Sequence, residues 1–418
     1  MSSYLERNPL LYPLEPSAPA ARHYVVIPVF DENESIGRTL SALKSALQHA
    51  PEPVAVVLVL NEPADCSVQA QAADRELLAS LQKNDGKYDG GLSIGRELFY
   101  INLLDSEIKE KFRTVGNARK VGFDSVIAQS DGKVTDKKSW LFSLDADTLV
   151  DENYLSCALA WAQSHPQAAG AVFAFNHRCE SPEPAVNIAA MRYEIFLLDY
   201  AVKLRSCGSA YGFWTIGSAF MCNAADYMRC GGMRRHAAGE DFYFLQALRK
   251  VGAVEIIPDC WVYPAGRLSG RVPFGTGPAI AGQLAGKDIE LYAAESFELL
   301  RKFFHQAAVS SYDQLSNGIM ELAAEHLQAF FNELNFAEIW QRIVRNTPKN
   351  HAALHQALHI YCDGFFILKF CHWLEDKYPQ KFTRQKLLQN DPQELQTLLK
   401  KLQDALELQP RGNALKSL

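Results

Sequence analysis

Three features are missing from this sequence of 418 residues, and each absence argues against a class of protein. No run approaches the ~18 consecutive apolar residues of a membrane-spanning helix. The nine cysteines form an odd set without a Cys-x-x-Cys pair, so neither a disulfide framework nor a zinc site is indicated. No Gly-x-Gly-x-x-Gly motif follows a predicted strand, which argues against a dinucleotide-binding dehydrogenase.

An excess of basic residues is also missing. The formal net charge is −6, whereas a nucleic-acid partner would favour a basic face, so we expect no nucleic-acid binding. Hydrophobic residues make up 48% and charged residues 22%, as in ordinary globular proteins. The N-terminus repeats proline and has no long apolar core, so it does not predict a secretory signal. We expect a cytoplasmic protein without a transmembrane segment; peripheral membrane contact and a homodimer stay open.

The chain is too long for one compact core, and its amino-acid composition and periodicity change along its length. Residues 1–22 form a Pro-rich extension. Residues 23–284 alternate apolar runs with helical patterns, which predicts an α/β fold. Residues 285–418 are rich in Leu, Phe, Ala, His and Gln at helical spacing, which predicts an all-α C-terminal domain.

A strand, a helix and a second strand are predicted in residues 24–30, 36–49 and 54–60. This spacing is typical of a βαβ unit, which implies a parallel sheet and a right-handed crossover. Ligands of open parallel sheets gather at the carboxyl ends of the strands. Phe30, Glu32 and Asn61 all lie at such ends.

The strand predicted over residues 139–144 ends in two carboxylates, Asp145 and Asp147. If the extended form continues, both point the same way, because strand side chains alternate between faces. Two such acids repel each other unless a cation lies between them, and their hard oxygens suit Mg²⁺ or Mn²⁺. The alternative is a solvated turn followed by a helix cap, since Asp and Thr favour both.

Other polar groups lie at predicted helix starts or in loops. Arg119 and Lys120 near the start of a helix are unusual, because the helix dipole disfavours cations there; an anionic ligand explains them, and two solvated side chains are the alternative. Glu240 and Asp241 begin a helix, where acids are also favoured as caps. The later loop holds Arg267 and Arg271.

Five motifs in this order resemble those of the family 2 glycosyltransferases. Residues 26–34 (VIPVFDENE) are similar to the opening strand of that family, and Asn61 and Asp65 stand where its second strand usually offers two acids four residues apart. Residues 116–122 (GNARKVG) resemble its GxARNxG helix start. Residues 145–147 match its DxD motif, and residues 240–241 match its ED motif.

The resemblance covers the first ~280 residues and implies an inverting transferase of the GT-A fold, a Rossmann-like, mostly parallel sheet flanked by helices. The donor would be a UDP- or GDP-sugar, a hexosyl group would be transferred to an acceptor hydroxyl, and Mn²⁺ or Mg²⁺ would be the cofactor. The acceptor is unknown. A sugar-nucleotide-synthesising enzyme would instead carry a Gly-rich loop after the first strand, which this chain lacks.

Carried over position by position, the resemblance implies roles for named residues. Asp241 would be the catalytic base, with Glu240 beside it facing the acceptor. Asp147, with Asp145, would bind the metal. The donor would contact Pro28, Phe30, Glu32, Asn61, Arg119, Lys120, Asp145, Ala146, Arg267 and Arg271. The acceptor would lie near Trp214, Gly217 and Ser218.

Two departures from the family pattern matter. Lys120 replaces the usual Asn, and Arg267 stands in the segment where many relatives supply a metal-binding His. We expect Arg267 and Arg271 to take part of the diphosphate charge, because guanidinium groups chelate phosphate oxygens; two solvated arginines in a surface loop are the alternative. A non-catalytic nucleotide-sugar-binding scaffold of the same fold is the competing function.

Overall fold

The computed structural model describes residues 2–8, 12, 21–63, 65–83, 98–104, 113–129, 138–235, 239–270 and 273–409. By packing, the chain divides into two compact units, each drawn from separate stretches of sequence. The first comprises Met1–Ala190, Thr215–Ala281 and Glu407–Leu418, and the second comprises Met191–Trp214 and Gly282–Leu406. These boundaries differ from the contiguous ranges expected from the sequence.

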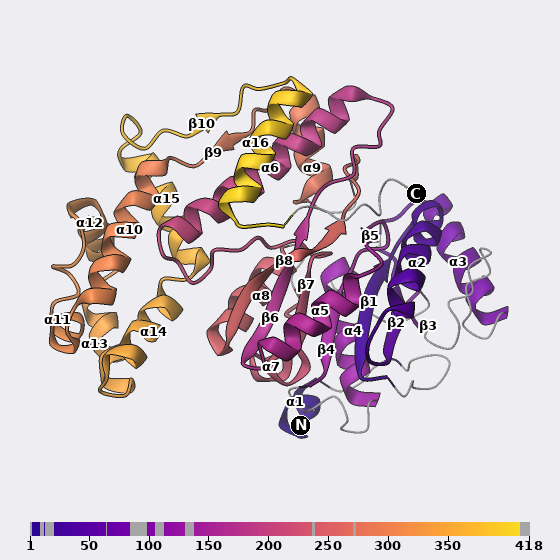
Figure 1. The fold of residues 1–418 in the computed structure, drawn as a ribbon, viewed down its shortest axis with the longest axis horizontal. Helices are drawn as coiled ribbons and strands as arrows, with labels where there is room; N and C mark the ends of the chain where they lie inside the picture. Colours follow the sequence, from indigo (N-terminus) through magenta and orange to yellow (C-terminus); the bar gives the residue numbers. More distant parts are fainter. Residues whose placement is uncertain are drawn as a thin grey trace. The chain divides into compact units, whose positions relative to one another are not determined.

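The first unit is built on an eight-stranded sheet with the strand order β3-β2-β1-β4-β7-β6-β8-β5 (Figure 1). Four strand pairings are parallel and three are antiparallel. The predicted β1–α2–β2 unit is present, with Val25 paired to Val56. The strands are β1 (His23–Val29), β2 (Val54–Leu60), β3 (Leu98–Asn102), β4 (Trp140–Ser143), β5 (Leu149–Val150), β6 (Ala168–Phe175), β7 (Phe220–Asn223) and β8 (Ala253–Tyr263).

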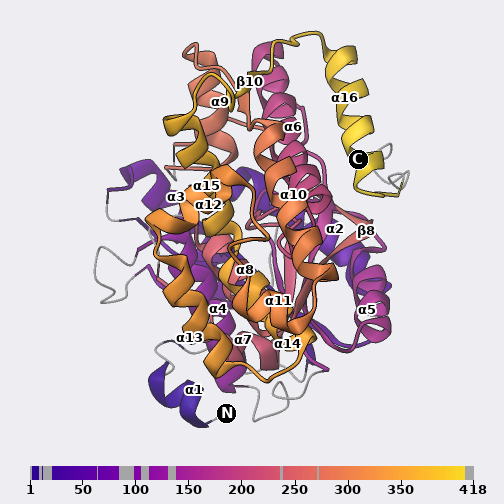
Figure 2. The ribbon, with the colours of Figure 1, turned by 90° about the vertical axis from the view of Figure 1, so that its left-hand side faces the viewer.

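Helices cover both faces of this sheet. Figures 1 and 2 together show α2 and α5 on one side, and α4 and α8 on the other. The helices of this unit are α1 (Ser2–Arg7), α2 (Asn33–Gln48), α3 (Val68–Lys83), α4 (Val115–Gln129), α5 (Tyr154–Ser164), α7 (Ala224–Arg229) and α8 (Glu240–Val251). The predicted α/β class, a mostly parallel sheet flanked by helices, is confirmed.

The second unit is mainly helical, as the composition of the C-terminal third predicts. Its short strands, β9 (Glu290–Leu291) and β10 (Gln385–Lys386), pair antiparallel. Its helices are α10 (Ala294–Val309), α11 (Tyr312–Asn317), α12 (Glu325–Glu333), α13 (Phe336–Asn346), α14 (His351–Tyr361), α15 (Gly364–Lys377) and α16 (Pro392–Ala405). Two further helices, α6 (Pro184–Ser206) and α9 (Thr276–Leu284), have residues in both units.

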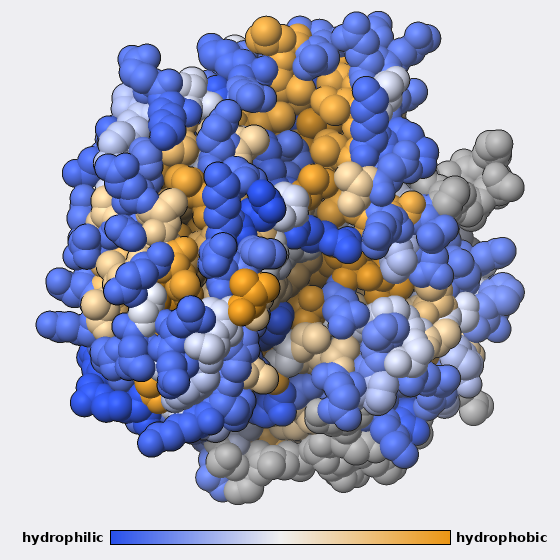
Figure 3. Space-filling model, turned by 60° about the vertical axis from the view of Figure 1, so that its left-hand side comes forward, coloured by the Kyte–Doolittle hydropathy of each residue, from blue (hydrophilic) through white to orange (hydrophobic). Residues whose placement is uncertain are grey.

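Each unit has its own apolar core. All seven residues of β1 and all seven of β2 are buried, because helices cover both faces of these parallel strands. In the second unit, buried aromatic rings such as Phe303, Phe331 and Trp340 form the core. Figure 3 shows a largely hydrophilic face with apolar patches between the polar side chains. Among the described residues, no helix combines the length and the apolar character needed to cross a membrane.

Candidate active site

Most of the predicted site residues of the first unit lie at one end of the strands, the end where the parallel strands have their carboxyl termini. The parallel strands β1, β2, β4, β6 and β8 all end there. Strand β7 runs antiparallel, so the segment before it, with Gly217 and Ser218, lies at the same end. Carboxyl ends of strands are where ligands of open α/β sheets bind. The topology therefore collects segments that are far apart in the sequence.

The turn after β1 holds Glu32 in place. Asp31 has a left-handed backbone (φ 52°), which is uncommon for a residue with a side chain and marks local strain. Its amide donates to Asp74 Oδ1 at 2.9 Å, and Asn33 Nδ2 donates to the carbonyl of Ala73 at 2.8 Å. Helix α3 therefore fixes this turn, and Glu32 beside it is 5% exposed.

The two acids of the DxD motif lie in a turn rather than in a continued strand. Strand β4 ends at Ser143, and the amide of Thr148 donates to the carbonyl of Asp145 at 3.1 Å. Thr39 Oγ1 donates to the carbonyl of Ala146, and Arg178 Nη2 donates to the carbonyl of Asp147, both at 2.8 Å. The acids thus sit on a fixed backbone, although the extended form does not continue.

Arg119 joins the DxD motif to the ED motif. Its Nη2 donates to Asp145 Oδ1, and its Nη1 donates to Glu240 Oε1. The Arg119 side chain is 3% exposed and that of Glu240 is 6% exposed. Burial opposes the charge of Arg119, but the carboxylates of Asp145, Glu240 and Asp241 outweigh it and raise the pKa of the guanidinium. One buried charge therefore holds acids from two distant segments together.

Two glycines leave the room that this bridge needs. A Cβ added at Gly217 would lie 2.5 Å from Arg119 Nη2. A Cβ added at Gly116 would lie 2.7 Å from Cγ of Glu240. Ser143 Oγ also donates to the carbonyl of Gly217 at 2.5 Å, which fixes this segment against β4. A side chain at either glycine would push one partner of the bridge out of place.

Asp241 begins helix α8 beside this bridge. Burial and the adjacent carboxylate of Glu240 raise its pKa to about 7, while Arg119 acts in the opposite direction. Its Oδ1 accepts from the backbone amide of Phe242 at 2.7 Å. A carboxylate whose pKa lies near neutral pH can both accept and release a proton, which is the property of a general base.

Arg267 makes the second bridge of the site. Its Nε and Nη2 donate to Asp147 Oδ2 at 3.0 and 2.8 Å, and Nη2 also donates to Glu32 Oε1. Its side chain is 40% exposed, whereas its partners Asp147 and Glu32 are 17% and 5% exposed. In the Arg119 bridge the guanidinium is buried and Asp145 is the exposed member, at 36%. Among the described residues, six carboxylates and four arginines stand around the two bridges and Arg178: Glu32, Asp145, Asp147, Glu180, Glu240 and Asp241, with Arg38, Arg119, Arg178 and Arg267.

Lys120 lies in another cluster, although it follows Arg119 directly. Its Nζ donates to Asp124 Oδ2 at 2.6 Å and to Asn8 Oδ1 at 2.9 Å. Asp124 also accepts from the hydroxyls of Tyr4 and Tyr227. The predicted contact of Lys120 with the donor would require its ammonium group to leave this buried network.

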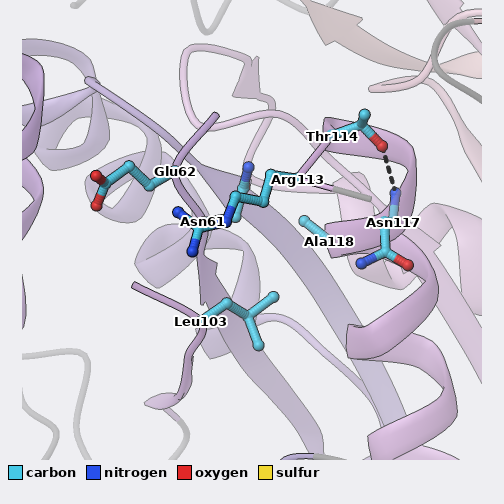
Figure 4. A pocket seen from close by; sticks show the side chains of 7 residues that line it. All are labelled: Asn61, Glu62, Leu103, Arg113, Thr114, Asn117 and Ala118. Atoms are coloured by element: carbon cyan, nitrogen blue, oxygen red, sulfur yellow. Dashed lines mark hydrogen bonds between the residues drawn. The ribbon is translucent and has the colours of Figure 1, made fainter. Parts of the chain in front are cut away.

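A small pocket lies where β2 and β3 end and α4 begins. It holds about 200 Å³ of space, part of it open to solvent. Seven residues line it: Asn61, Glu62, Leu103, Arg113, Thr114, Asn117 and Ala118 (Figure 4). Asn117 is 2% exposed, and its Oδ1 has no hydrogen-bond partner among the described residues. The sequence singled out Asn61 but not Asn117, because a neutral amide inside a helix gives no charge signal.

The remaining predicted residues fall in different places. Pro28 is buried in β1, and Phe30 follows it, partly exposed. Ser218 is 1% exposed, and its Oγ has no hydrogen-bond partner in the described part of the chain. Trp214 is buried and belongs to the second unit. Arg271 lies outside the described residues.

Asp147 and Asp145 are the acids that the sequence assigns to a divalent cation. Within the described residues, no group of three or more His, Cys, Asp or Glu side chains is arranged to hold a metal. The guanidinium of Arg267 does bind Asp147, so the position beside this carboxylate already accepts a positive charge. Carboxylate oxygens are the ligands that Mg²⁺ and Mn²⁺ prefer, so Asp147 fits such an ion as a single protein ligand beside phosphate oxygens.

No protein-family model and no curated protein matches the sequence. Among solved structures, the chain is similar to TarS of S. aureus (residues 1–349) in complex with UDP-GlcNAc, with 12% identity, a TM-score of 0.39, and 78% of this chain and 90% of that chain covered. It is also similar to the mannosyltransferase PcManGT from Pyrobaculum calidifontis in complex with GDP-Man and Mn²⁺, with 14% identity, a TM-score of 0.37, and 97% and 90% covered.

These neighbours are glycosyltransferases, the class that the sequence motifs resemble. At such identities and TM-scores, the likeness assigns no donor, acceptor or mechanism to this chain. Those have to follow from the side chains of the site.

Proposed function

We propose that this chain is an inverting, family 2-like glycosyltransferase that moves a hexosyl group from a nucleoside diphosphate sugar to an acceptor hydroxyl. The observation that carries the proposal is the bridge through Arg119, which brings Asp145 of the DxD motif and Glu240 of the ED motif onto one guanidinium. Acids on the phosphate side and on the acceptor side of such a reaction must lie around one donor. The bridge supports that arrangement.

Asp241 acts as the general base. An acceptor hydroxyl is a poor nucleophile, so a carboxylate takes its proton as the oxygen attacks the sugar carbon from the face opposite the leaving diphosphate. The pKa of about 7 suits this role near neutral pH. Glu240 is bound to Arg119 and fixes the start of α8, which makes it a positioning residue for Asp241.

Negative charge grows on the diphosphate as the sugar leaves, and positive groups must stabilise it. Arg267 is the exposed arginine of the site and can reach toward phosphate oxygens, which guanidinium groups bind in pairs. Asp147, with Asp145 near it, would hold the predicted Mn²⁺ or Mg²⁺, and this ion would supply further positive charge beside the diphosphate when bound.

The nucleoside lies, in this proposal, at the ends of β1 and β2. Pro28, Phe30 and Glu32 would line one side of it and Asn61 the other, where the pocket beside Asn117 opens. Ala146 is the small residue between the two acids of the DxD turn. For the acceptor we keep the predicted neighbours Trp214, Gly217 and Ser218.

The non-catalytic scaffold is the second candidate. It would predict a damaged set of acids, but Asp145, Asp147 and Asp241 are all present and Asp241 has a shifted pKa. Perturbed pKa values of this kind cluster at functional sites. We therefore favour turnover. The screen below is designed to identify the nucleotide of the donor, UDP or GDP, and its sugar.

The test is a screen of UDP- and GDP-sugars by thermal shift with Mn²⁺, followed by assay of nucleoside diphosphate release. A ligand that binds only the native state raises the melting temperature. We expect one donor class to stabilise the wild type, and Asp147→Asn to lose most of this shift. Asp404→Asn, at an exposed acid of α16, is the matched control and should keep it. If no nucleotide sugar stabilises the wild type, the proposal is wrong.

A further inference from the structure

Arg267 binds two carboxylates that come from separate elements. Asp147 lies in the turn after β4 and Glu32 in the turn after β1, and this guanidinium joins the two. Three N–H contacts from one side chain give a fixed, fork-like geometry that a lysine would not reproduce. The guanidinium therefore stands beside Asp147, where a divalent cation would bind the same oxygens.

The backbone before Arg267 is held by hydrogen bonds that do not involve its side chain. This backbone is tied to the segment after β6, because the amide of Arg178 donates to the carbonyl of Pro264 at 2.9 Å and the amide of Gly266 donates to the carbonyl of Arg178 at 3.1 Å. The side chain itself is 40% exposed. A partly solvated side chain on a fixed backbone can change its rotamer at low cost, and the exchange requires no more than that.

The charges of the site give a reason for such a change. In the part of the chain that the structure describes, six carboxylates, Glu180 included, stand against four arginines, Arg38 included, so the site is negative before a diphosphate arrives. Like charges at close range repel strongly in a partly buried site. A divalent cation on Asp147 adds two positive charges where Arg267 supplies one, and it leaves the guanidinium available to the incoming phosphates.

We propose that Arg267 occupies the cation position on Asp147 in the donor-free protein and exchanges with a divalent cation when the nucleotide sugar binds. The inference rests on the proposed function and deepens it, because Arg267 and the metal would bind the same carboxylate, that of Asp147, at different times. Arg267 and the cation compete for Asp147. The free protein consequently binds the metal more weakly than the same protein without Arg267.

The test is a titration of the full-length protein with Mn²⁺ alone, in which electron paramagnetic resonance measures the free aquo ion. Removal of a positive competitor should tighten binding, so we expect Arg267→Ala to lower the Kd for Mn²⁺ by roughly three- to tenfold, the range of a partly exposed ion pair. The effect should shrink at high salt. Asp147→Asn in the Arg267→Ala background should abolish the gain.

Arg301→Ala is the matched control. Arg301 is also exposed (52%) and binds a single carboxylate, Glu298, at 2.6 Å, so its removal uncovers an acid away from the site. We expect no change in Mn²⁺ affinity for this variant. Urea unfolding of Arg267→Ala in a single cooperative transition, with the protein folded in the absence of urea, excludes a folding defect as the cause.

Unchanged or weaker Mn²⁺ binding by Arg267→Ala would overturn the exchange. So would a wild-type thermal shift by the nucleotide sugar that stays the same in EDTA and in Mn²⁺, because Arg267 would then keep its place on Asp147. The Mn²⁺ titration contains no donor, so its outcome is independent of whether the protein transfers sugar.

Discussion

The two arginine bridges of the site use the same chemistry, but their guanidinium groups differ in exposure. Arg119 is 3% exposed and holds Asp145 and Glu240, whereas Arg267 is 40% exposed and holds Asp147 and Glu32. A buried ion pair is costly to open, because a charge left alone in the interior is poorly solvated. The guanidinium of Arg267 is partly solvated, so water offsets part of what this arginine loses when it leaves its carboxylates, although Glu32 and Asp147 are only 5% and 17% exposed. The Arg119 bridge thus fixes Asp145 and Glu240 relative to each other. Arg267 can exchange its carboxylate partners for a ligand.

This contrast assigns different work to the two sides of the site. On the side of Arg119, Asp241 needs a constant position and a pKa near 7 to accept a proton. On the side of Arg267, Asp147 lies, in our proposal, where the diphosphate of the donor and its cation bind and dissociate in each reaction cycle. Substitutions on the two sides should therefore have different effects, and equal effects would show that the two sides do not differ.

The largest effect is expected at the base. Asp241→Asn keeps the shape of the side chain but cannot accept the proton, so we expect nucleoside diphosphate release to fall by roughly 10²- to 10⁴-fold, the usual contribution of a general base. Donor binding, measured by thermal shift, should stay near that of the wild type, in contrast to Asp147→Asn. Near-normal turnover would remove Asp241 from the mechanism.

Loss of the buried arginine should unfold the protein more readily than loss of the exposed one. Arg119→Met leaves two carboxylates without their partner, and we expect a loss of about 3–5 kcal/mol in the free energy of unfolding. Arg267→Met removes a partly solvated guanidinium but leaves Glu32 and Asp147, which are 5% and 17% exposed, without it, so we expect a smaller loss of about 1–3 kcal/mol. Urea unfolding, extrapolated to water, measures both. Equal losses would mean that the two bridges do not differ as we describe.

A smaller effect is expected from crowding the buried bridge. Gly217→Ala places a Cβ 2.5 Å from Arg119 Nη2 in the present geometry, so the guanidinium or the chain has to shift. We expect a loss of about 1–3 kcal/mol, the range of overpacked sites. Gly270→Ala is the matched control, because no atom of the described residues would lie within 4 Å of its Cβ. Urea unfolding that shows the two variants to be equally stable would contradict a tightly enclosed Arg119.

The pH dependence of turnover reports on the side of Arg119. The raised pKa of Asp241, about 7, means that the carboxylate becomes protonated as the pH falls through 7. Only the ionised form accepts a proton, so nucleoside diphosphate release at low donor concentration should fall about tenfold per pH unit below 7. A profile that stays flat down to pH 5 would show that this carboxylate does not limit the reaction.

Much of the fold could be predicted from the sequence, since uninterrupted apolar runs such as residues 24–30 and 54–60 have few alternatives to buried parallel strands. From the sequence, the DxD acids share a face if the strand continues, and a turn is the alternative. The structure closes a turn there, because the amide of Thr148 bonds to the carbonyl of Asp145. A single backbone hydrogen bond does not change the spacing of apolar residues, so the pattern of the sequence could not decide between the turn and the strand.

The arginine bridges could not be predicted as pairs. Arg119 and Glu240 are 121 residues apart, and Arg267 and Glu32 are 235 residues apart, so only the folded sheet brings them together. Lys120 illustrates a second limit. Consecutive helical residues point about 100° apart, so its position next to Arg119 in the sequence does not place it on the same side.

The most direct test of the central claim is a crystal structure of Asp241→Asn with Mn²⁺ and the nucleotide sugar that the screen selects. The account predicts the diphosphate beside Asp147, Arg267 turned away from that carboxylate, and the sugar carbon facing residue 241. A donor bound elsewhere, or a sugar that points away from the start of α8, would contradict it.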